Sequence, residues 1–177
     1  MESFAPPRRL VDNQRFESDR KNVLEKLVLD EVDAPIRSIV DGFSRLPFCF
    51  TLQCCYGHFV HSEVPAPDNL EPLPAIDVGT VTYRIAYLAL CIQNSSAGNQ
   101  LLSELAGVPS INPDLIQFGS PRWFWDRHVN SYALQVEPSR FAGRDQATID
   151  YAEAVQVQKV RDEFYAKLTD LVNLLQN

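Results

Sequence analysis

The chain has 177 residues, of which 45% are hydrophobic and 22% charged, values typical of one globular domain (residues 1–177) with its own core. Its net charge of −7 argues against sequence-independent binding to nucleic acid, which needs lysine and arginine to displace counterions. No apolar run is long enough to span a bilayer, and the N-terminus, Met-Glu-Ser-Phe-Ala-Pro-Pro-Arg-Arg, lacks the apolar core of a secretory signal. We therefore predict a cytoplasmic protein with reduced cysteines and no membrane contact.

The first third of the chain is predicted to be largely helical. Residues 1–12 contain two prolines and little periodicity, so we expect a loose N-terminal lead-in there. Apolar residues at helical spacing predict a helix over 16–30. A second helix is predicted to begin at Asp33, a good N-cap with proline in the following turn, and to end before Pro47.

The most distinctive stretch is Phe48–His61, which holds three of the four cysteines and two of the three histidines. Its alternating apolar side chains predict a buried strand, and Gly57 supplies the backbone freedom for a tight turn at its end. Sites tend to form at strand ends in sheets flanked by helices. The polar and sulfur-bearing side chains at this strand end are Gln53, Cys54, Cys55, Tyr56, His58 and His61.

The middle of the chain is predicted to alternate strands and helices. A proline-rich loop is expected over 62–79, and a strand over Thr80–Ile92, whose apolar second half indicates burial on both faces. Three shorter elements complete this part. They are a helix from Asn94 or Ser95 to Ala106, a strand over 115–119 and a strand over 129–136.

The last element is predicted to be a long helix from Asp145 or Thr148 nearly to Asn177. We expect its apolar stripe to pack on the domain, with a homodimer through this C-terminal helix as the alternative. The stripe consists of Val157, Val160, Phe164, Leu168, Leu171 and Leu175. Together these elements predict an α/β (mixed α+β) fold, with a single mixed sheet flanked by helices.

Two segments carry a family resemblance. Residues 32–36 read Val-Asp-Ala-Pro-Ile, and residues 51–58 read Thr-Leu-Gln-Cys-Cys-Tyr-Gly-His. A later strand ends in Leu-Ala-Leu-Cys at Cys91 and is followed by a leucine-rich helix. In order and spacing, the chain from Phe16 to Gly119 resembles the small tRNA wybutosine-synthesising methyltransferase family, which carries Val-Asp-x-x-Ile, Thr-x-Ser-Ser-Cys-Ser-Gly-Arg and His-x-x-Cys at these places.

The resemblance implies a methyl transfer from S-adenosylmethionine to a modified guanosine beside a tRNA anticodon. It thus implies S-adenosylmethionine as cofactor and tRNA as partner, although the net charge of −7 counts against tRNA. Of the six-residue signature only Cys55 and Gly57 are kept, and the arginine is replaced by His58. The alternative is a non-catalytic domain that binds a small ligand or another protein.

The segment Arg122–His128 is rich in aromatic and basic residues. If it is extended, Trp123 and Trp125 share a face and could form a stacking platform with Arg127 and His128, but we expect them to pack at the core edge. The candidate ligand site lies between this segment, the Cys55–His58 turn and the strand end at Cys91. Its predicted residues are Thr51, Gln53, Cys55, Tyr56, Gly57, His58, Cys91, Trp123, Trp125, Arg127 and His128.

The cysteines and histidines suggest two other chemistries, metal binding and nucleophilic catalysis. Cys54, Cys55, His58 and His61 carry zinc's preferred donors, but adjacent strand cysteines face opposite sides and the spacing matches no zinc finger. We therefore expect structural cysteines and no metal. Cys54 or Cys55 as nucleophile, with His58 or His128 as base, is the other alternative. No glycine-rich phosphate loop occurs among the seven glycines.

Overall fold

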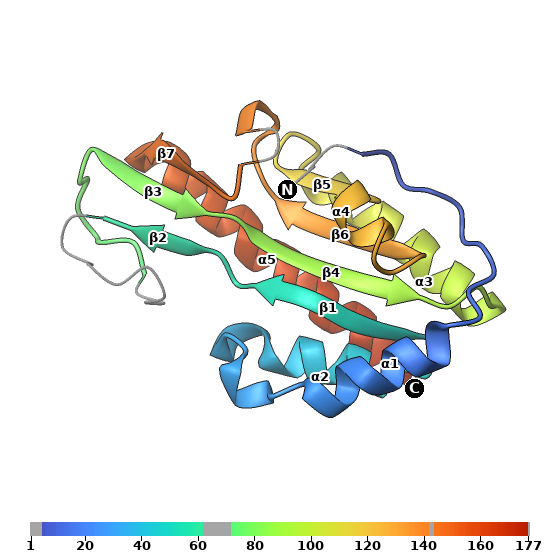
Figure 1. Cartoon of the computed structure of the whole chain (residues 1–177). Helices are drawn as coiled ribbons and strands as arrows, with labels where there is room; N and C mark the ends of the chain where they lie inside the picture. Colours follow the sequence, from blue (N-terminus) through green and yellow to red (C-terminus); the bar gives the residue numbers. More distant parts are fainter. Residues whose placement is uncertain (1–4, 62–71, 142–143, 177) are drawn as a thin grey trace.

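The computed structural model describes residues 5–61, 72–141 and 144–176. In this part of the chain, seven strands form two antiparallel sheets, and helices pack on them (Figure 1). The four-stranded sheet has the order β1 (Cys49–Cys55), β4 (Ala86–Ile92), β6 (Ser131–Val136), β5 (Ile116–Gly119). The three-stranded sheet has the order β2 (His58–Val60), β3 (Thr80–Arg84), β7 (Gln146–Asp150). The predicted α/β class and the long C-terminal helix are confirmed, but two antiparallel sheets replace the expected single mixed sheet.

The two sheets are joined by one bent ribbon. β1 continues into β2 across Gly57, and β3 continues into β4 across Ile85, so that Cys55 pairs with Tyr87 and His58 with Arg84. The predicted tight turn at Gly57 is therefore wrong, because the chain bends there without reversing. Gly57 has a φ of +89°, in the left-handed region that favours glycine. A Cβ at this position would lie 2.8 Å from the Cβ of Ala86, so the ribbon also needs glycine for space.

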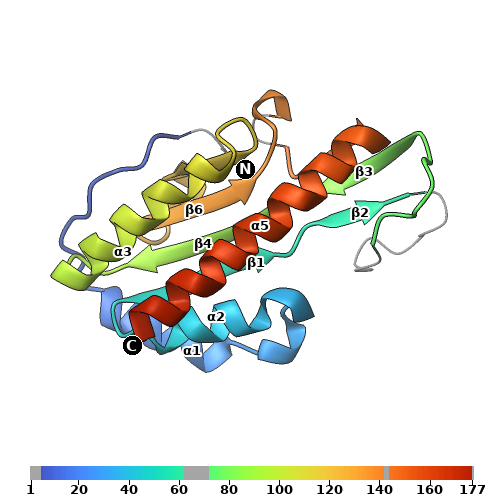
Figure 2. The same cartoon turned by 180° about the vertical axis from the view of Figure 1, so that it is seen from behind.

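One face of the sheets is covered by α2 (Arg37–Arg45), α3 (Ser96–Gly107) and α5 (Tyr151–Gln176), as Figure 2 shows. α5 crosses both sheets and contacts α2, β3, β6 and β7. Its predicted apolar stripe from Val157 to Leu171 is buried, and Leu175 packs against the same core. The stripe thus packs within the chain as expected, and the homodimer through this helix stays a prediction. None of the described helices is both long and apolar enough to cross a membrane.

The opposite face is covered by α1 (Phe16–Lys26), α4 (Arg122–Trp125) and the segment before α1. α1 packs Phe16 onto Phe50, with ring centroids 5.5 Å apart, and Cys91 completes this small cluster. α4 buries Phe124 against two alanines of the neighbouring strands. These two short helices leave part of the face between them and the ribbon bend uncovered (Figure 1).

Residues 5–12 have no regular secondary structure, but they are not loose as expected. The Ser120 N–H donates to the Ala5 carbonyl, and the Arg8 N–H donates to Ser120 Oγ. The Tyr132 hydroxyl donates to the Arg8 carbonyl at 2.9 Å. The Asn130 side chain receives the Val11 N–H and donates to the Val11 carbonyl. Hydrogen bonds to Ser120, Asn130 and Tyr132 therefore hold residues 5–12 against the sheet.

Several predicted boundaries differ from the structure. The first helix ends at Lys26, and Asp33 forms no side-chain cap for the 3-10 turn Ala34–Ile36 that precedes α2. Ser95 caps α3 as predicted, since its Oγ accepts the Gly98 N–H at 3.1 Å. β7 occupies residues where a helix was expected, and α5 begins after it at Tyr151. Of the predicted proline-rich loop, residues 62–71 lie outside the described residues.

Candidate functional site

A cavity of about 520 Å³ lies where the ribbon bends, beside α4. Its wall is formed by the ends of β1 and β4, the β2–β3 pair, α4 and the loop before the Ala34–Ile36 turn. The residues of this wall are Asp33, Gln53, Cys54, Cys55, His58, Arg84, Ile85, Tyr87, Trp123 and Asp145.

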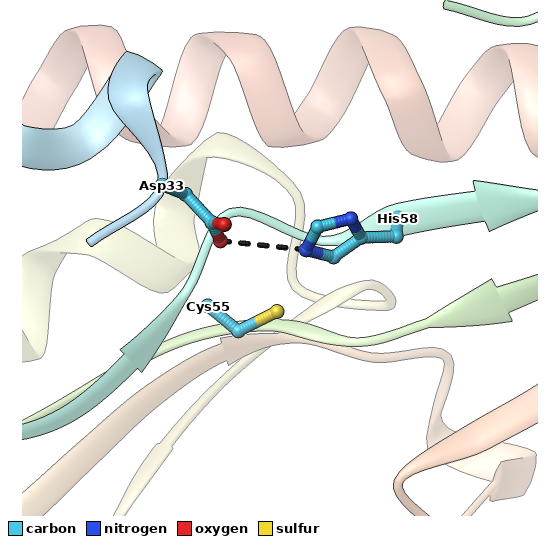
Figure 3. A group of neighbouring side chains, drawn as sticks. All are labelled: Asp33, Cys55 and His58. Carbon is cyan, nitrogen blue, oxygen red and sulfur yellow. Dashed lines mark ion pairs between the residues drawn. The ribbon is translucent and has the colours of Figure 1, made fainter. Parts of the chain in front are cut away.

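The Asp33 carboxylate and the His58 imidazole are in contact in this wall. The Asp33 Oδ2 atom accepts the Tyr56 N–H at 2.7 Å and lies 3.4 Å from Nε2 of His58, which is buried (Figure 3). The hydrogen bond from His58 lowers the pKa of Asp33 below its ordinary value of 3.8, aided by the Tyr56 N–H and the Arg84 charge and opposed by burial. The carboxylate is therefore ionised at neutral pH.

Cys55 completes a group of three side chains around one point. Its Sγ, one carboxylate oxygen of Asp33 and one ring nitrogen of His58 all lie within 4.8 Å of one another. The Gly57 N–H donates to Cys55 Sγ at 3.4 Å, which helps to orient the sulfur. Figure 3 shows the three side chains pointing toward one another. A thiol, an imidazole and a carboxylate in this arrangement can bind a cation or activate a thiol.

The rest of the wall combines both signs of charge with flat rings. Arg84 pairs with His58 across β2 and β3, and the main chain of Asp145 accepts the Ile85 N–H at 3.1 Å. Tyr87 and Trp123 supply rings, and Trp123 is 45% exposed. Burial raises the pKa of Tyr87 to about 12, so its phenol stays neutral in the physiological range. A ligand in this cavity would meet carboxylates, a guanidinium and two aromatic surfaces.

The other three cysteines are chemically quiet. Burial is the largest cause that raises the pKa of Cys49, Cys54 and Cys91, in each case to about 12. Cys54 lines the cavity but does not belong to the Asp33–Cys55–His58 group. Of the four residues considered as metal ligands from the sequence, the structure thus brings Cys55 and His58 into one group. Cys54 and His61 do not belong to this group.

Three predicted site residues lie away from the cavity, and two of them, Cys91 and His128, lie beneath α1. Thr51 is buried in β1, and the Cys91 thiol donates to the Val129 carbonyl at 3.3 Å. The ring of His128 meets Phe50 edge-on, and its Nδ1 lies 3.7 Å from an oxygen of Asp19. The predicted strand end at Cys91 is therefore part of the packing under α1 and does not reach the cavity.

The predicted aromatic platform is divided by α4. Since residues 122–125 are helical rather than extended, Trp123 and Trp125 do not share a face. Trp125 packs edge-on against Tyr132 with the guanidinium of Arg8 4.8 Å from its ring centroid, as expected for a packing residue. Trp123 reaches the cavity, and Arg127 lies 4.1 Å from its ring centroid.

Tyr56 and Gly57 face the far side of the ribbon. The Tyr56 ring stacks on Tyr165 at 5.4 Å, and the guanidinium of Arg161 lies 4.0 Å from its centroid. Arg161 also donates to the Gly57 carbonyl at 2.9 Å. These residues border a smaller cavity of about 200 Å³. Their contribution to the main cavity is made by the backbone, through the two N–H groups that hold Asp33 and Cys55.

Four predicted site residues lie in the cavity wall: Gln53, Cys55, His58 and Trp123. The wall also contains residues that were not predicted: Asp33, which the sequence indicated as a helix cap, Arg84, Tyr87 and Asp145. The one signal for Asp33 was its place in the Val-Asp-x-x-Ile segment of the resemblance. Arg84 comes from β3, Tyr87 from β4 and Asp145 from the loop before β7. No local sequence pattern distinguishes them as site residues.

No family model and no curated protein matches the chain. Among solved structures, the PH1069 protein from Pyrococcus horikoshii is similar at 12% identity and a TM-score of 0.46, over 92% of this chain and 95% of that chain.

Proposed function

We propose that the cavity at the ribbon bend binds a small molecule, S-adenosylmethionine being the specific candidate. The observation that carries the proposal is the meeting of Gln53, Cys55 and His58 with Trp123 in one cavity wall. These residues come from the stretch that resembles the methyltransferase signature and from an aromatic segment 65 positions later (123 − 58). The volume of the cavity, about 520 Å³, lies in the range of small-molecule sites, roughly 300–1,000 Å³.

The chemistry of the wall matches the parts of this molecule. S-adenosylmethionine carries a positive sulfonium and ammonium, a carboxylate and a purine ring. The carboxylates of Asp33 and Asp145 attract cations, and Arg84 attracts a carboxylate. Trp123 and Tyr87 offer flat surfaces to a purine, a contact worth about 1–3 kcal/mol per stacked base. Arg84 and Asp145 already have partners within the chain, which the ligand would share or displace.

Transfer of the methyl group to a modified nucleoside is the finer part of the proposal, and the family resemblance supports it. The enzyme's contribution to such a displacement is to hold donor and acceptor in line and to exclude water. Cys55 and Gly57, the two kept signature positions, lie at the bend that shapes the cavity.

A specific observation favours the non-catalytic alternative. At the position of the family's arginine stands His58, which is buried and in contact with the Asp33 carboxylate. This imidazole cannot give the two-pronged hydrogen bond with which a guanidinium holds a carboxylate or phosphate. A domain that keeps the ligand cavity without the transfer reaction would show this replacement.

Calorimetric titration with S-adenosylmethionine and with S-adenosylhomocysteine tests the proposal. We expect one equivalent with micromolar affinity, about −8 kcal/mol. Trp123→Ala should weaken binding about tenfold or more through lost stacking, whereas Leu174→Ala, an exposed apolar side chain near the end of α5, should leave it unchanged. Absence of heat and of thermal stabilisation with both compounds would refute S-adenosylmethionine as ligand.

The two functions then separate in a transfer assay. Purified protein is incubated with labelled S-adenosylmethionine and total cellular RNA, and incorporation into RNA is measured. Incorporation supports the methyltransferase, and binding without incorporation supports the non-catalytic domain. The net charge of −7 predicts that sequence-independent binding to the RNA is weak.

A further inference from the structure

The bend in the ribbon directs two side chains of one strand to the same point. Cys55 and His58 are three residues apart, and in a regular strand they would face opposite sides of the sheet. Gly57, with a φ of +89°, rotates the chain between them. Both therefore reach the cavity wall, where the Asp33 carboxylate joins them from the loop before α2 (Figure 3). The three donor atoms lie within 4.8 Å of one another.

Each of these side chains is held in place by its surroundings. Asp33 is oriented by the Tyr56 N–H at 2.7 Å, and Cys55 Sγ by the Gly57 N–H at 3.4 Å. His58 is only 5% exposed, so its ring has little freedom to turn. Hydrogen bonds to ligand side chains of this kind fix their direction in metal sites, and their loss costs about 10–100-fold in affinity.

We propose that Asp33, Cys55 and His58 form a binding site for one divalent transition-metal ion, with Zn²⁺ as the best match. Zinc accepts a mixed set of sulfur, nitrogen and oxygen donors, whereas Ca²⁺ and Mg²⁺ require oxygen. Tetrahedral zinc bonds of about 2.0–2.3 Å place the donors roughly 3.3–3.8 Å apart. The three donor atoms lie within 4.8 Å of one another, so a bound ion would draw them closer by about 1 Å.

The site has three protein ligands and one open side. Zinc sites with three protein ligands use the fourth position for water or a ligand, and here all three residues belong to the wall of the main cavity. An ion at this point would also compensate the negative charge of the carboxylate and thiolate. Its fourth position would offer an oxygen, nitrogen or sulfur atom of a cavity ligand a direct bond. This proposal does not depend on S-adenosylmethionine.

The test uses the metal alone on the full, untagged chain after treatment with chelator. Zn²⁺ is titrated by calorimetry, and Co²⁺ is titrated by absorption spectroscopy because cobalt bound to a thiolate gives a charge-transfer band. We expect one equivalent of either ion and a thiolate-to-cobalt band in the wild type. Cys55→Ser should abolish the band and weaken Zn²⁺ binding by at least about 100-fold.

Cys54→Ser is the matched control, since it removes the adjacent thiol, which does not belong to the group of three donors. It should keep both the band and the affinity. Loss of the band in Cys54→Ser, or no thiolate-to-cobalt band in the wild type, would overturn the site.

A second variant keeps the proposal testable where Cys55→Ser fails to fold by circular dichroism. Asp33→Asn retains an oxygen that can accept the Tyr56 N–H, so the loop can stay in place. It should keep the cobalt band but weaken Zn²⁺ binding at least about tenfold. Unchanged affinity in this variant would overturn the three-residue site. These titrations contain no S-adenosylmethionine, so their outcome and that of the ligand titration are independent.

Discussion

At the scale of single residues, environment separates four cysteines of the same chemical type. Cys49 and Cys91 are fully buried in the sheet, and Cys54 is half-buried beside the Asp33 carboxylate. Cys55 is half-buried as well, but its sulfur belongs to the Asp33–Cys55–His58 group in the cavity wall and receives a backbone N–H. Thiolates, not thiols, are nucleophiles and metal ligands, so this difference decides which cysteine can do chemistry.

The difference between Cys55 and the other three cysteines predicts that iodoacetamide at pH 8 alkylates Cys55 selectively in metal-free protein. A thiol with a pKa of about 12 is ionised in only about one molecule in 10⁴ at this pH, which applies to Cys49, Cys54 and Cys91. We expect Cys55 to react at least about tenfold faster than the other three. The rates are followed by mass spectrometry of peptides over time.

Because Cys54 and Cys55 share a peptide, the rates are compared in Cys54→Ser and Cys55→Ser. Fast labelling should persist in Cys54→Ser and disappear in Cys55→Ser. Equally slow labelling of all four cysteines in the wild type would contradict the chemical distinction of Cys55.

The candidate site could be predicted from sequence only where its residues lie in one chain segment. Gln53, Cys55 and His58 stand out because polar and sulfur-bearing groups follow an apolar strand. Asp33 reads as an ordinary cap, since its reach to the Tyr56 N–H depends on how the loop before α2 folds back onto β1. Cys91 and His128 have the right chemistry, but packing under α1 holds them elsewhere.

At the scale of elements, the joint between β1 and β2 is the feature that builds the cavity. Gly57 satisfies two demands there, a left-handed φ and space beside Ala86. Gly79 provides a natural comparison, because its φ of +80° is also left-handed but a Cβ there would meet nothing within 4 Å. Substitution of Gly79 therefore tests the backbone strain alone, whereas substitution of Gly57 tests the strain together with the steric overlap.

We predict that Gly57→Ala destabilises the protein more than Gly79→Ala. A left-handed alanine costs about 1–2 kcal/mol at either position. At Gly57 the overlap with Ala86 adds about 1–3 kcal/mol. Denaturant unfolding of both variants and the wild type measures the difference in free energy of unfolding. Equal losses would mean that the ribbon relaxes around the added methyl and that space at the bend is not required.

Elements were predictable from sequence where local pattern and tertiary role agree. The apolar runs over 49–55 and 86–92 predict strands because those strands are buried in the sheet. β7 was missed because only Ile149 among its five residues is buried, so its alternation is faint and its pairing with β3 is non-local. α4 was missed because a single helical turn leaves no periodicity to read.

At the scale of the whole molecule, the two faces of the sheets are covered in different ways. α2, α3 and α5 cover one face, and the 26-residue α5 contacts strands of both sheets (Figure 2). The other face carries α1, the single-turn helix α4 and the segment of residues 5–12 (Figure 1). The cavity lies on this second face, where α4 contributes Trp123 to its wall.

Removal of residues 1–11 is predicted to destabilise the whole fold. The segment makes five hydrogen bonds to Ser120, Asn130 and Tyr132. At about 0.5–1.5 kcal/mol net for each hydrogen bond, their loss should lower the free energy of unfolding by about 2.5–7.5 kcal/mol. Denaturant unfolding of the truncated and full-length chains measures this value, and an unchanged value would mean that the segment is not held in solution.

Tyr132→Phe shows whether the segment acts through the contacts seen. In the full chain this change removes only the hydroxyl that donates to the Arg8 carbonyl, and it should cost about 1 kcal/mol. In the truncated chain the same change should cost close to nothing, because the acceptor is gone. The resulting coupling of about 1 kcal/mol is the signature of direct contact. An equal loss of free energy of unfolding in both chains would contradict this. It would mean that the Tyr132 hydroxyl stabilises the sheet and makes no hydrogen bond to the Arg8 carbonyl in solution.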